Sequence, residues 1–288
     1  LLNLIASDSR LKSLPYWESL RPFQEKILNL DNKKDSRQEE AFKEYESFLQ
    51  TMPLLKSMHD MHPNHIHEEI ELQAMDFSTY LPEWLAYVPE WRDYYLSHNQ
   101  INHYEYLRDV LKAMQFIQGP KKWILKSPQH LEQITPLLGT FPDATFAITY
   151  RDPLSVVLST ATMLSYGDRV RRYKVEPKNN FNYWHNRIKT LLERFSKDYQ
   201  LIPTDQKCDV FFQDLIKDNL NSVKSIYSKN SFEIDKIANN EIKEYINANK
   251  RGKDGQVIYN LEDFNVDKSE FYKSFKFYFD KFDILKEV

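Results

Sequence analysis

The sequence is poor in the glycines that build several common nucleotide sites. It has five glycines in 288 residues, at positions 119, 139, 167, 252 and 255. It contains no Gly-x-Gly-x-x-Gly turn for a dinucleotide and no Gly-x₄-Gly-Lys-Ser/Thr loop for a nucleoside triphosphate. The printed residues therefore give no support to those nucleotide-binding classes, and they weaken the hypothesis of a nucleoside-phosphate kinase.

Cysteine, long apolar runs and excess positive charge are also scarce. Cys208 is the single cysteine, which excludes an internal disulfide. The sequence also lacks an apolar segment at its start of the kind found in secretory signal peptides. Together these two features favour a reducing, cytoplasmic location. No run approaches the roughly 18 apolar residues that indicate a transmembrane helix. The net charge of −3 provides no basic field for nucleic acid, so any anion site must be built from local groups.

Residues 123–163 predict two buried parallel strands that each lead into a helix. The runs 123–125 and 144–150 are rich in β-branched and aromatic residues without clean alternation, which is typical of strands covered on both faces. After each run the sequence repeats a cation, a helix-capping residue and a proline. The two triplets are Lys126-Ser127-Pro128 and Arg151-Asp152-Pro153.

Lys126 and Arg151 are thus expected at the strand ends of an open α/β sheet, where such sheets bind ligands. Cations beside helix N-termini predict a site for an anion such as phosphate or sulfate. A single charge beside a loop is usually only solvated, so the repetition of the unit is what favours this interpretation.

The same residues resemble a known family. Tyr150–Ser159, which reads Tyr-Arg-Asp-Pro-Leu-Ser-Val-Val-Leu-Ser, resembles the 3′-phosphate-binding motif of sulfotransferases that use 3′-phosphoadenosine 5′-phosphosulfate (PAPS). In that motif a strand-end Arg and a helix Ser eight residues later hold the 3′-phosphate, and Arg151 and Ser159 have this spacing. Leu125–His130, Leu-Lys-Ser-Pro-Gln-His, is similar to a segment of one bacterial-type sulfotransferase family and to the Lys-Thr-Pro segment of tyrosylprotein sulfotransferases. The resemblance extends along the whole chain.

The resemblance implies an α/β, P-loop-NTPase-like sulfotransferase fold, with a short parallel sheet flanked by many helices. We expect one domain over residues 1–288, with a helical, aromatic insert on the acceptor side at about 30–118 and a nucleotide-binding core at about 119–288. The family places a strand and a Pro-Arg-Ser/Thr-Gly-Thr-Thr loop, which cradles the 5′-phosphosulfate, before the helix that opens the printed chain. We expect that loop in the full protein, because a doubly wound sheet without its central strand would expose its neighbours; the alternative is a homologue that has lost it.

The resemblance also implies PAPS as the donor and adenosine 3′,5′-bisphosphate as the product. Because the bound phosphate already supplies much of the binding energy, we expect that no metal is required. The segment 249–255 resembles the family's C-terminal Arg-Gly-Lys-x-Gly loop, which implies phosphate contacts from Arg251, Gly252 and Lys253. The sequence departs from the family at Asp254, where a His is usual.

Lys126 matches the lysine that stabilises the leaving bridge oxygen in the tyrosylprotein enzymes. The base is left open between Glu18, in a segment resembling the family's Trp-Glu segment, and His130, one turn after Pro128. Glu18 as an ordinary helix-start carboxylate and His130 as an ordinary helix residue remain alternatives.

The histidine-rich segment 59–69 matches no standard zinc spacing. The family carries a His and a Glu at positions matching His59 and Glu69, which implies acceptor binding; a solvated loop is the alternative. The many aromatic residues at 77–106 are expected mainly in the core, and some suit a small-molecule or lipid-like hydroxyl acceptor. A peptide tyrosine or a glycan also remains open.

Further helices are expected at 35–57, 104–117, 181–199, 215–227 and 235–249, a third strand at 208–212 and a basic loop at 164–180. In the helix at 104–117 the residues spaced for burial are Tyr104, Leu107, Leu111, Met114 and Ile117. Two other functional hypotheses remain: a non-catalytic nucleotide- or sulfate-binding homologue, and a helical interaction scaffold whose strand-end cations are incidental.

Overall fold

The structure is a computed structural model that describes residues 1–24, 35–250, 252–253, 255 and 257–288. The chain forms two compact units that interleave along the sequence. Unit 1 comprises residues 1–56, 60–142 and 235–249, and unit 2 comprises residues 57–59, 143–234 and 250–288. The single domain with an insert at about 30–118 stays a prediction.

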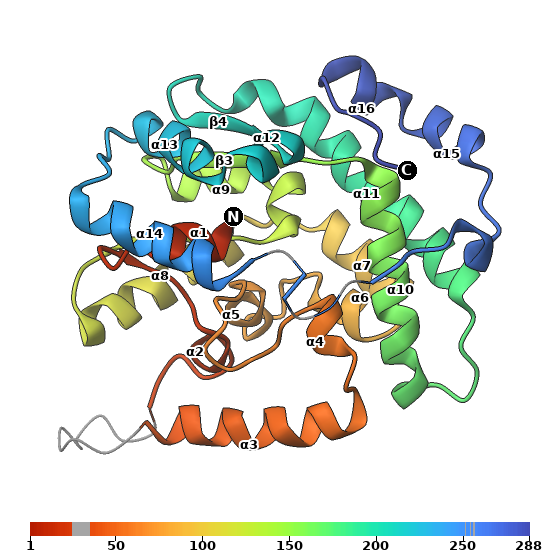
Figure 1. The fold of residues 1–288 in the computed structure, drawn as a ribbon, viewed down its shortest axis with the longest axis horizontal. Coiled ribbons are helices and arrows are strands. Elements are labelled where there is room, and N and C mark those ends of the chain that lie inside the picture. The colour runs from red at the N-terminus through yellow and green to blue at the C-terminus, as the bar shows by residue number, and fades with distance from the viewer. Residues whose placement is uncertain (25–34, 251, 254, 256) are drawn as a thin grey trace. The chain divides into compact units, whose positions relative to one another are not determined.

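Unit 1 is mostly helical (Figure 1). Its helices are α1 (Leu2–Ala6), α2 (Tyr16–Leu20), α3 (Ser36–Thr51), α5 (Ile70–Ala74), α6 (Leu81–Leu85), α7 (Pro89–Ser97), α8 (Ile101–Gln118), the 3₁₀ helix η1 (Pro128–Glu132), α9 (Ile134–Thr140) and α14 (Lys236–Ala248). Helix α4 (Leu55–Met58) crosses from unit 1 into unit 2. Strands β1 (Leu11–Lys12) and β2 (Lys122–Trp123) pair in parallel.

Helix α8 supplies much of the core of unit 1. Its buried face carries the predicted residues Tyr104, Leu107, Leu111 and Met114, whereas Ile117 is 51% exposed, contrary to the spacing argument. The helix ends at Gly119, whose φ of 88° lies in the left-handed region that glycine adopts readily.

Unit 2 places long helices beside a second parallel strand pair (Figure 1). Strand β3 (Phe146–Tyr150) pairs in register with β4 (Lys207–Phe211), and α10 (Pro153–Arg171) packs along α11 (Pro177–Asp198). The remaining elements are η2 (Tyr199–Leu201), α12 (Phe212–Lys217), α13 (Asn219–Lys229), η3 (Leu261–Phe264), α15 (Lys268–Ser274) and α16 (Lys276–Lys281). No helix of the described residues is long and apolar enough to cross a membrane.

The strand predictions are confirmed with shifted ends, but the two predicted strands belong to different sheets. The run at 123–125 forms β2 in the pair β1–β2, and the run at 144–150 forms β3 in the pair β3–β4. The basic loop predicted at 164–180 is wrong over its first half, because α10 continues to Arg171. Buried Asp168 stabilises this last turn: it pairs with Arg172 at 3.2 Å and accepts a hydrogen bond from Asn180.

The two cation–cap–proline triplets fold differently. Asp152 caps α10 by accepting a hydrogen bond from the Leu154 amide, and Pro153 is the first helical residue, as predicted. Ser127 does not cap the turn that follows it, and its hydroxyl is buried with no hydrogen-bond partner in the described structure. That turn is the short 3₁₀ helix η1 rather than the start of an α-helix.

The Asp152 cap predicts a large and local stability effect. Asp152 is fully buried and also accepts hydrogen bonds from the Tyr272 hydroxyl and the Glu287 amide, both at 2.7 Å. Asp152→Ala should lower the free energy of unfolding by about 2–4 kcal/mol, because it removes a cap together with the buried carboxylate oxygen that accepts from both the Tyr272 hydroxyl and the Glu287 amide. The exposed cap of α15 is the control: Asp267→Ala should cost only about 1 kcal/mol. Urea titration measures both, and equal losses would contradict this assignment.

Candidate functional site

The loop that follows β2 is fixed by a buried carboxylate. Glu69 is fully buried, and its Oε2 accepts a hydrogen bond from the Lys126 amide at 2.9 Å. The Lys126 ammonium pairs with Glu68, and the Lys126 side chain remains 47% exposed. The backbone of Lys126 is therefore held from inside the unit while its charge stays accessible.

His130 lies between Glu69 and Tyr104, and both of its ring nitrogens have partners. Nε2 lies within hydrogen-bonding distance of Glu69 Oε1; because a carboxylate only accepts, Nε2 carries the proton. Nδ1 lies 2.7 Å from the hydroxyl of buried Tyr104, which donates to a neutral ring and accepts from a charged one. The role of His130 as the base stays a prediction, and in this arrangement neither nitrogen is open to a ligand.

Two groups of this network have perturbed pKa values. Burial on its own would raise the pKa of the Glu69 carboxyl, but the charge of His130 and the hydrogen bonds that Glu69 accepts outweigh burial and hold the pKa below its ordinary value. Burial, with smaller contributions from Tyr95 and Glu69, raises the pKa of Tyr104 well above its ordinary value. Glu69 is thus an ionised acceptor and Tyr104 keeps its proton.

Glu18, the other candidate base, is sealed inside unit 1. It is 2% exposed, its Oε2 pairs with Lys12 Nζ at 2.7 Å, and its Oε1 accepts a hydrogen bond from Gln118. Such surroundings are typical of a structural ion pair. The catalytic role of Glu18 stays a prediction. Glu69 is also fully buried and supports the Lys126 loop, and the acceptor contact that the resemblance implies for it stays a prediction. His59 is partly exposed and lies in unit 2.

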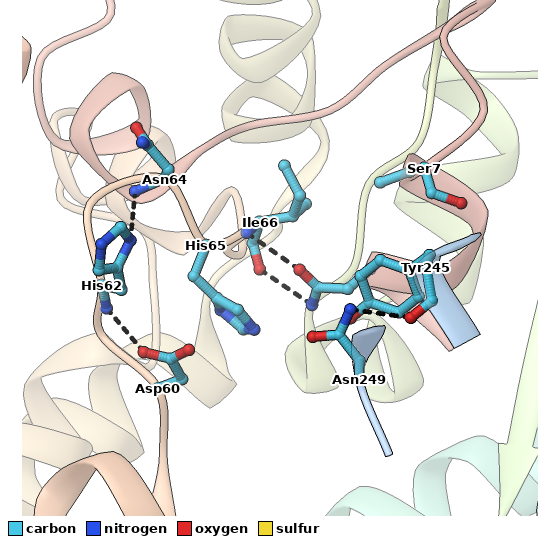
Figure 2. Close-up of a pocket in the computed structure, with 10 residues that line it drawn as sticks. Ser7, Asp60, His62, Asn64, His65, Ile66, Tyr245 and Asn249 are labelled. Atoms are coloured by element: carbon cyan, nitrogen blue, oxygen red, sulfur yellow. Dashed lines mark hydrogen bonds between the residues drawn. The ribbon is translucent and has the colours of Figure 1, made fainter. Parts of the chain in front are cut away.

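A pocket of about 330 Å³ opens in unit 1 (Figure 2). It lies between α1, the loop 60–66 and the end of α14, and its lining includes Asp60, His65, Tyr245 and Asn249. The buried Nδ1 of His65 has no hydrogen-bond partner in the described structure. Burial lowers the pKa of His65, Asp60 opposes that effect, and the Lys126 charge adds to it.

Arg151, in unit 2, already binds a carboxylate. Its Nε lies 3.1 Å from both oxygens of Glu287, its Nη2 donates to Glu287 Oε2 at 2.9 Å, and the guanidinium lies 4.2 Å from the Phe212 ring centre. This two-point contact is the geometry in which arginine recognises an oxyanion. The Arg151 side chain is 37% exposed.

Of the other predicted phosphate ligands, the structure describes Ser159, Gly252 and Lys253. Ser159 Oγ accepts a hydrogen bond from the Tyr259 hydroxyl at 3.1 Å, which leaves the serine proton available. Gly252 has a φ of 79°, and the Lys253 amide donates to the Lys250 carbonyl in a turn. Arg251 lies outside the described residues. Phosphate contacts from all four residues stay predictions.

Sequence reasoning missed Glu68 and Tyr104. Nothing in the local sequence indicates which of two adjacent glutamates faces the interior and which reaches the lysine. The helical spacing of Tyr104 correctly predicted burial but could not identify the partner of its hydroxyl, 26 residues further along the chain.

The lowered pKa of Glu69 predicts how its contribution to stability depends on pH. Glu69→Gln should lower the free energy of unfolding by about 3 kcal/mol at neutral pH, because it breaks a buried, charge-assisted network. A carboxyl whose folded-state pKa is depressed stabilises the fold fully above its unfolded-state pKa of about 4.3, and loses that effect as the pH falls through the folded-state value. The difference between wild type and variant, measured by urea titration, should therefore shrink only below about pH 4. A difference that already vanishes near neutral pH would contradict the assignment.

Comparison with known proteins identifies the family. The sequence matches the sulfotransferase family over residues 1–235. The structure is similar to sulfotransferase STF9 from Mycobacterium avium, with a TM-score of 0.83 and 18% identity over 99% of this chain and 74% of that one. It is also similar to sulfotransferase STF1 from Mycobacterium tuberculosis H37Rv, with a TM-score of 0.75 and 19% identity over 96% of this chain and 72% of that one. No curated protein matches the sequence. The predicted fold is therefore confirmed, and the chain belongs to the sulfotransferase family.

Proposed function

We propose that this chain transfers a sulfuryl group from PAPS to the hydroxyl of a small-molecule or lipid-like acceptor. The observation that carries the proposal is the family match over residues 1–235, together with an accessible lysine at the position where the family's motif predicts one. Lys126 follows β2 on a loop whose backbone is tied to buried Glu69. A cation held in this way can meet developing negative charge without reorganising the loop.

The residues of unit 2 fit a phosphate. The two-point contact of the Arg151 guanidinium with the Glu287 carboxylate supports an assignment of Arg151 to an oxyanion. We assign Arg151 and Ser159 to the 3′-phosphate of the donor, with Arg251, Gly252 and Lys253 as further contacts. A bound nucleotide would replace Glu287 at Arg151.

The donor supplies an activated sulfuryl group and leaves as adenosine 3′,5′-bisphosphate. The chain's contribution is to hold the phosphates, to place the Lys126 ammonium against the charge that builds on the departing bridge oxygen, and to accept the proton of the acceptor hydroxyl. The cytoplasmic location expected from the sequence stays a prediction.

The acceptor assignment is supported by apolar surface in the insert. Tyr80, Tyr95 and Tyr104 are buried, as expected for core aromatics, but Phe77 and Tyr87 are 78% and 60% exposed. Exposed aromatic side chains suit an acceptor with an apolar body.

The first test separates binding from turnover at Lys126. Adenosine 3′,5′-bisphosphate should raise the melting temperature of the full chain, because a ligand of the native state stabilises it. Lys126→Ala should keep this stabilisation but lower transfer of radiolabelled sulfate from PAPS by about 10²–10³-fold. Lys112→Ala, a substitution on exposed α8 surface, is the control. A variant that turns over at the wild-type rate would remove Lys126 from the mechanism, and wild-type protein that is not stabilised would contradict the proposed function.

A second test concerns the carboxylate on Arg151. Glu287→Gln should tighten binding of adenosine 3′,5′-bisphosphate by about twofold to fivefold, because a phosphate no longer has to break an ion pair worth up to about 1 kcal/mol. Arg151→Ala should weaken it by more than about tenfold. Isothermal titration calorimetry measures both, with exposed Glu262→Gln as the control. Unchanged or weaker binding in Glu287→Gln would argue against Arg151 as the phosphate ligand.

A further inference from the structure

The transfer reaction needs a group that accepts the proton of the acceptor hydroxyl. The structure limits which side chains can do so. Both oxygens of Glu18 are engaged beneath the surface by Lys12 and Gln118. Both nitrogens of His130 are engaged by Glu69 and Tyr104. A base must come within hydrogen-bonding distance of the hydroxyl that it deprotonates, which none of these atoms can do in this arrangement.

Glu68 differs from these groups in its surroundings. One of its oxygens pairs with the Lys126 ammonium, and its side chain is 10% exposed beside a lysine that is 47% exposed. Its neighbour Glu69 is fully buried and holds the Lys126 amide, so the two adjacent glutamates hold opposite ends of the same lysine. Glu68 is the carboxylate that lies directly beside the accessible ammonium.

We infer that Glu68 is the general base of the sulfuryl transfer. This inference rests on the proposed function and adds to it a catalytic residue that the sequence did not indicate. The pairing with Lys126 holds the carboxylate at the place where charge must be stabilised and a proton removed.

In the proposed transfer, one bond to sulfur replaces another. The acceptor oxygen forms a bond to sulfur while the bond from sulfur to the bridge oxygen breaks. The proton of the acceptor hydroxyl passes to a carboxylate oxygen of Glu68, and the electron pair of the broken bond stays on the bridge oxygen. Lys126 moves its charge from Glu68 to that oxygen, which frees Glu68 to accept the proton.

Two phenols distinguish a base from a merely structural carboxylate. In mildly alkaline buffer 4-nitrophenol is largely ionised and needs no base, whereas phenol keeps its proton. With PAPS as donor, Glu68→Gln should lower transfer to phenol by about 10²–10⁴-fold, the usual contribution of a general base. Transfer to 4-nitrophenol should fall by less than about tenfold. The acid limb of the kcat/KM profile for phenol should disappear as well.

Glu71→Gln is the matched control, because Glu71 lies on the adjacent helix α5 and pairs with His67 rather than with Lys126. It should leave the ratio of the two phenol rates unchanged. If wild type uses neither phenol, release of sulfate to water is measured instead, and Glu68→Gln alone should slow it.

Wild-type protein that neither binds adenosine 3′,5′-bisphosphate nor transfers or releases sulfate would contradict the proposed function. If wild type is active and the Glu68→Gln variant keeps its rate with phenol, or loses the rates with both phenols equally, Glu68 is not the general base. The proposed sulfotransferase function would still stand.

Discussion

The buried carboxylate of Glu69 is the group on which the arrangement of unit 1 around Lys126 depends. It accepts the Lys126 amide with one oxygen and the His130 ring with the other, in surroundings from which water is excluded. A buried charge is tolerated only when its hydrogen bonds are made, so the loop after β2 has one favourable position. Tyr104 extends the same network into the core face of α8.

Two consecutive residues, Glu68 and Glu69, contact different parts of Lys126. Glu69 faces inward and fixes the backbone, whereas Glu68 reaches the accessible ammonium of the same lysine. Because Glu69 is fully buried while the Lys126 side chain is 47% exposed, the exchange of ion partners that we propose for Lys126 would leave the support of its backbone in place. Functional groups held by rigid buried neighbours are the usual way in which proteins avoid reorganisation during a reaction.

Much of the fold could be predicted from the sequence, because several signals are local. Asp152-Pro153 starts α10 as expected, since the cap needs only the residues beside it. Ser127-Pro128 carries the same local signal but forms a 3₁₀ turn. The two segments differ because of tertiary contacts. The buried side chain of Gln129 accepts hydrogen bonds from the Thr79 hydroxyl and the Tyr80 amide, about 50 residues earlier in the chain. These bonds determine the course of the turn. A local sequence pattern does not reveal contacts between residues that are far apart in the chain, and the same holds for the partners of Glu68 and Tyr104, which lie 58 and 26 residues away.

The contact between Glu287 and Arg151 has a consequence for which anions unit 2 can bind. Because this exposed ion pair is worth up to about 1 kcal/mol, an anion that displaces Glu287 would bind Arg151 about twofold to fivefold more weakly than it would bind the unpaired guanidinium. A phosphate ester offers more charge and more acceptor oxygens to the guanidinium than a singly charged anion does. If Arg151 is the phosphate ligand that we propose, the glutamate would therefore favour the phosphate ester over weaker anions.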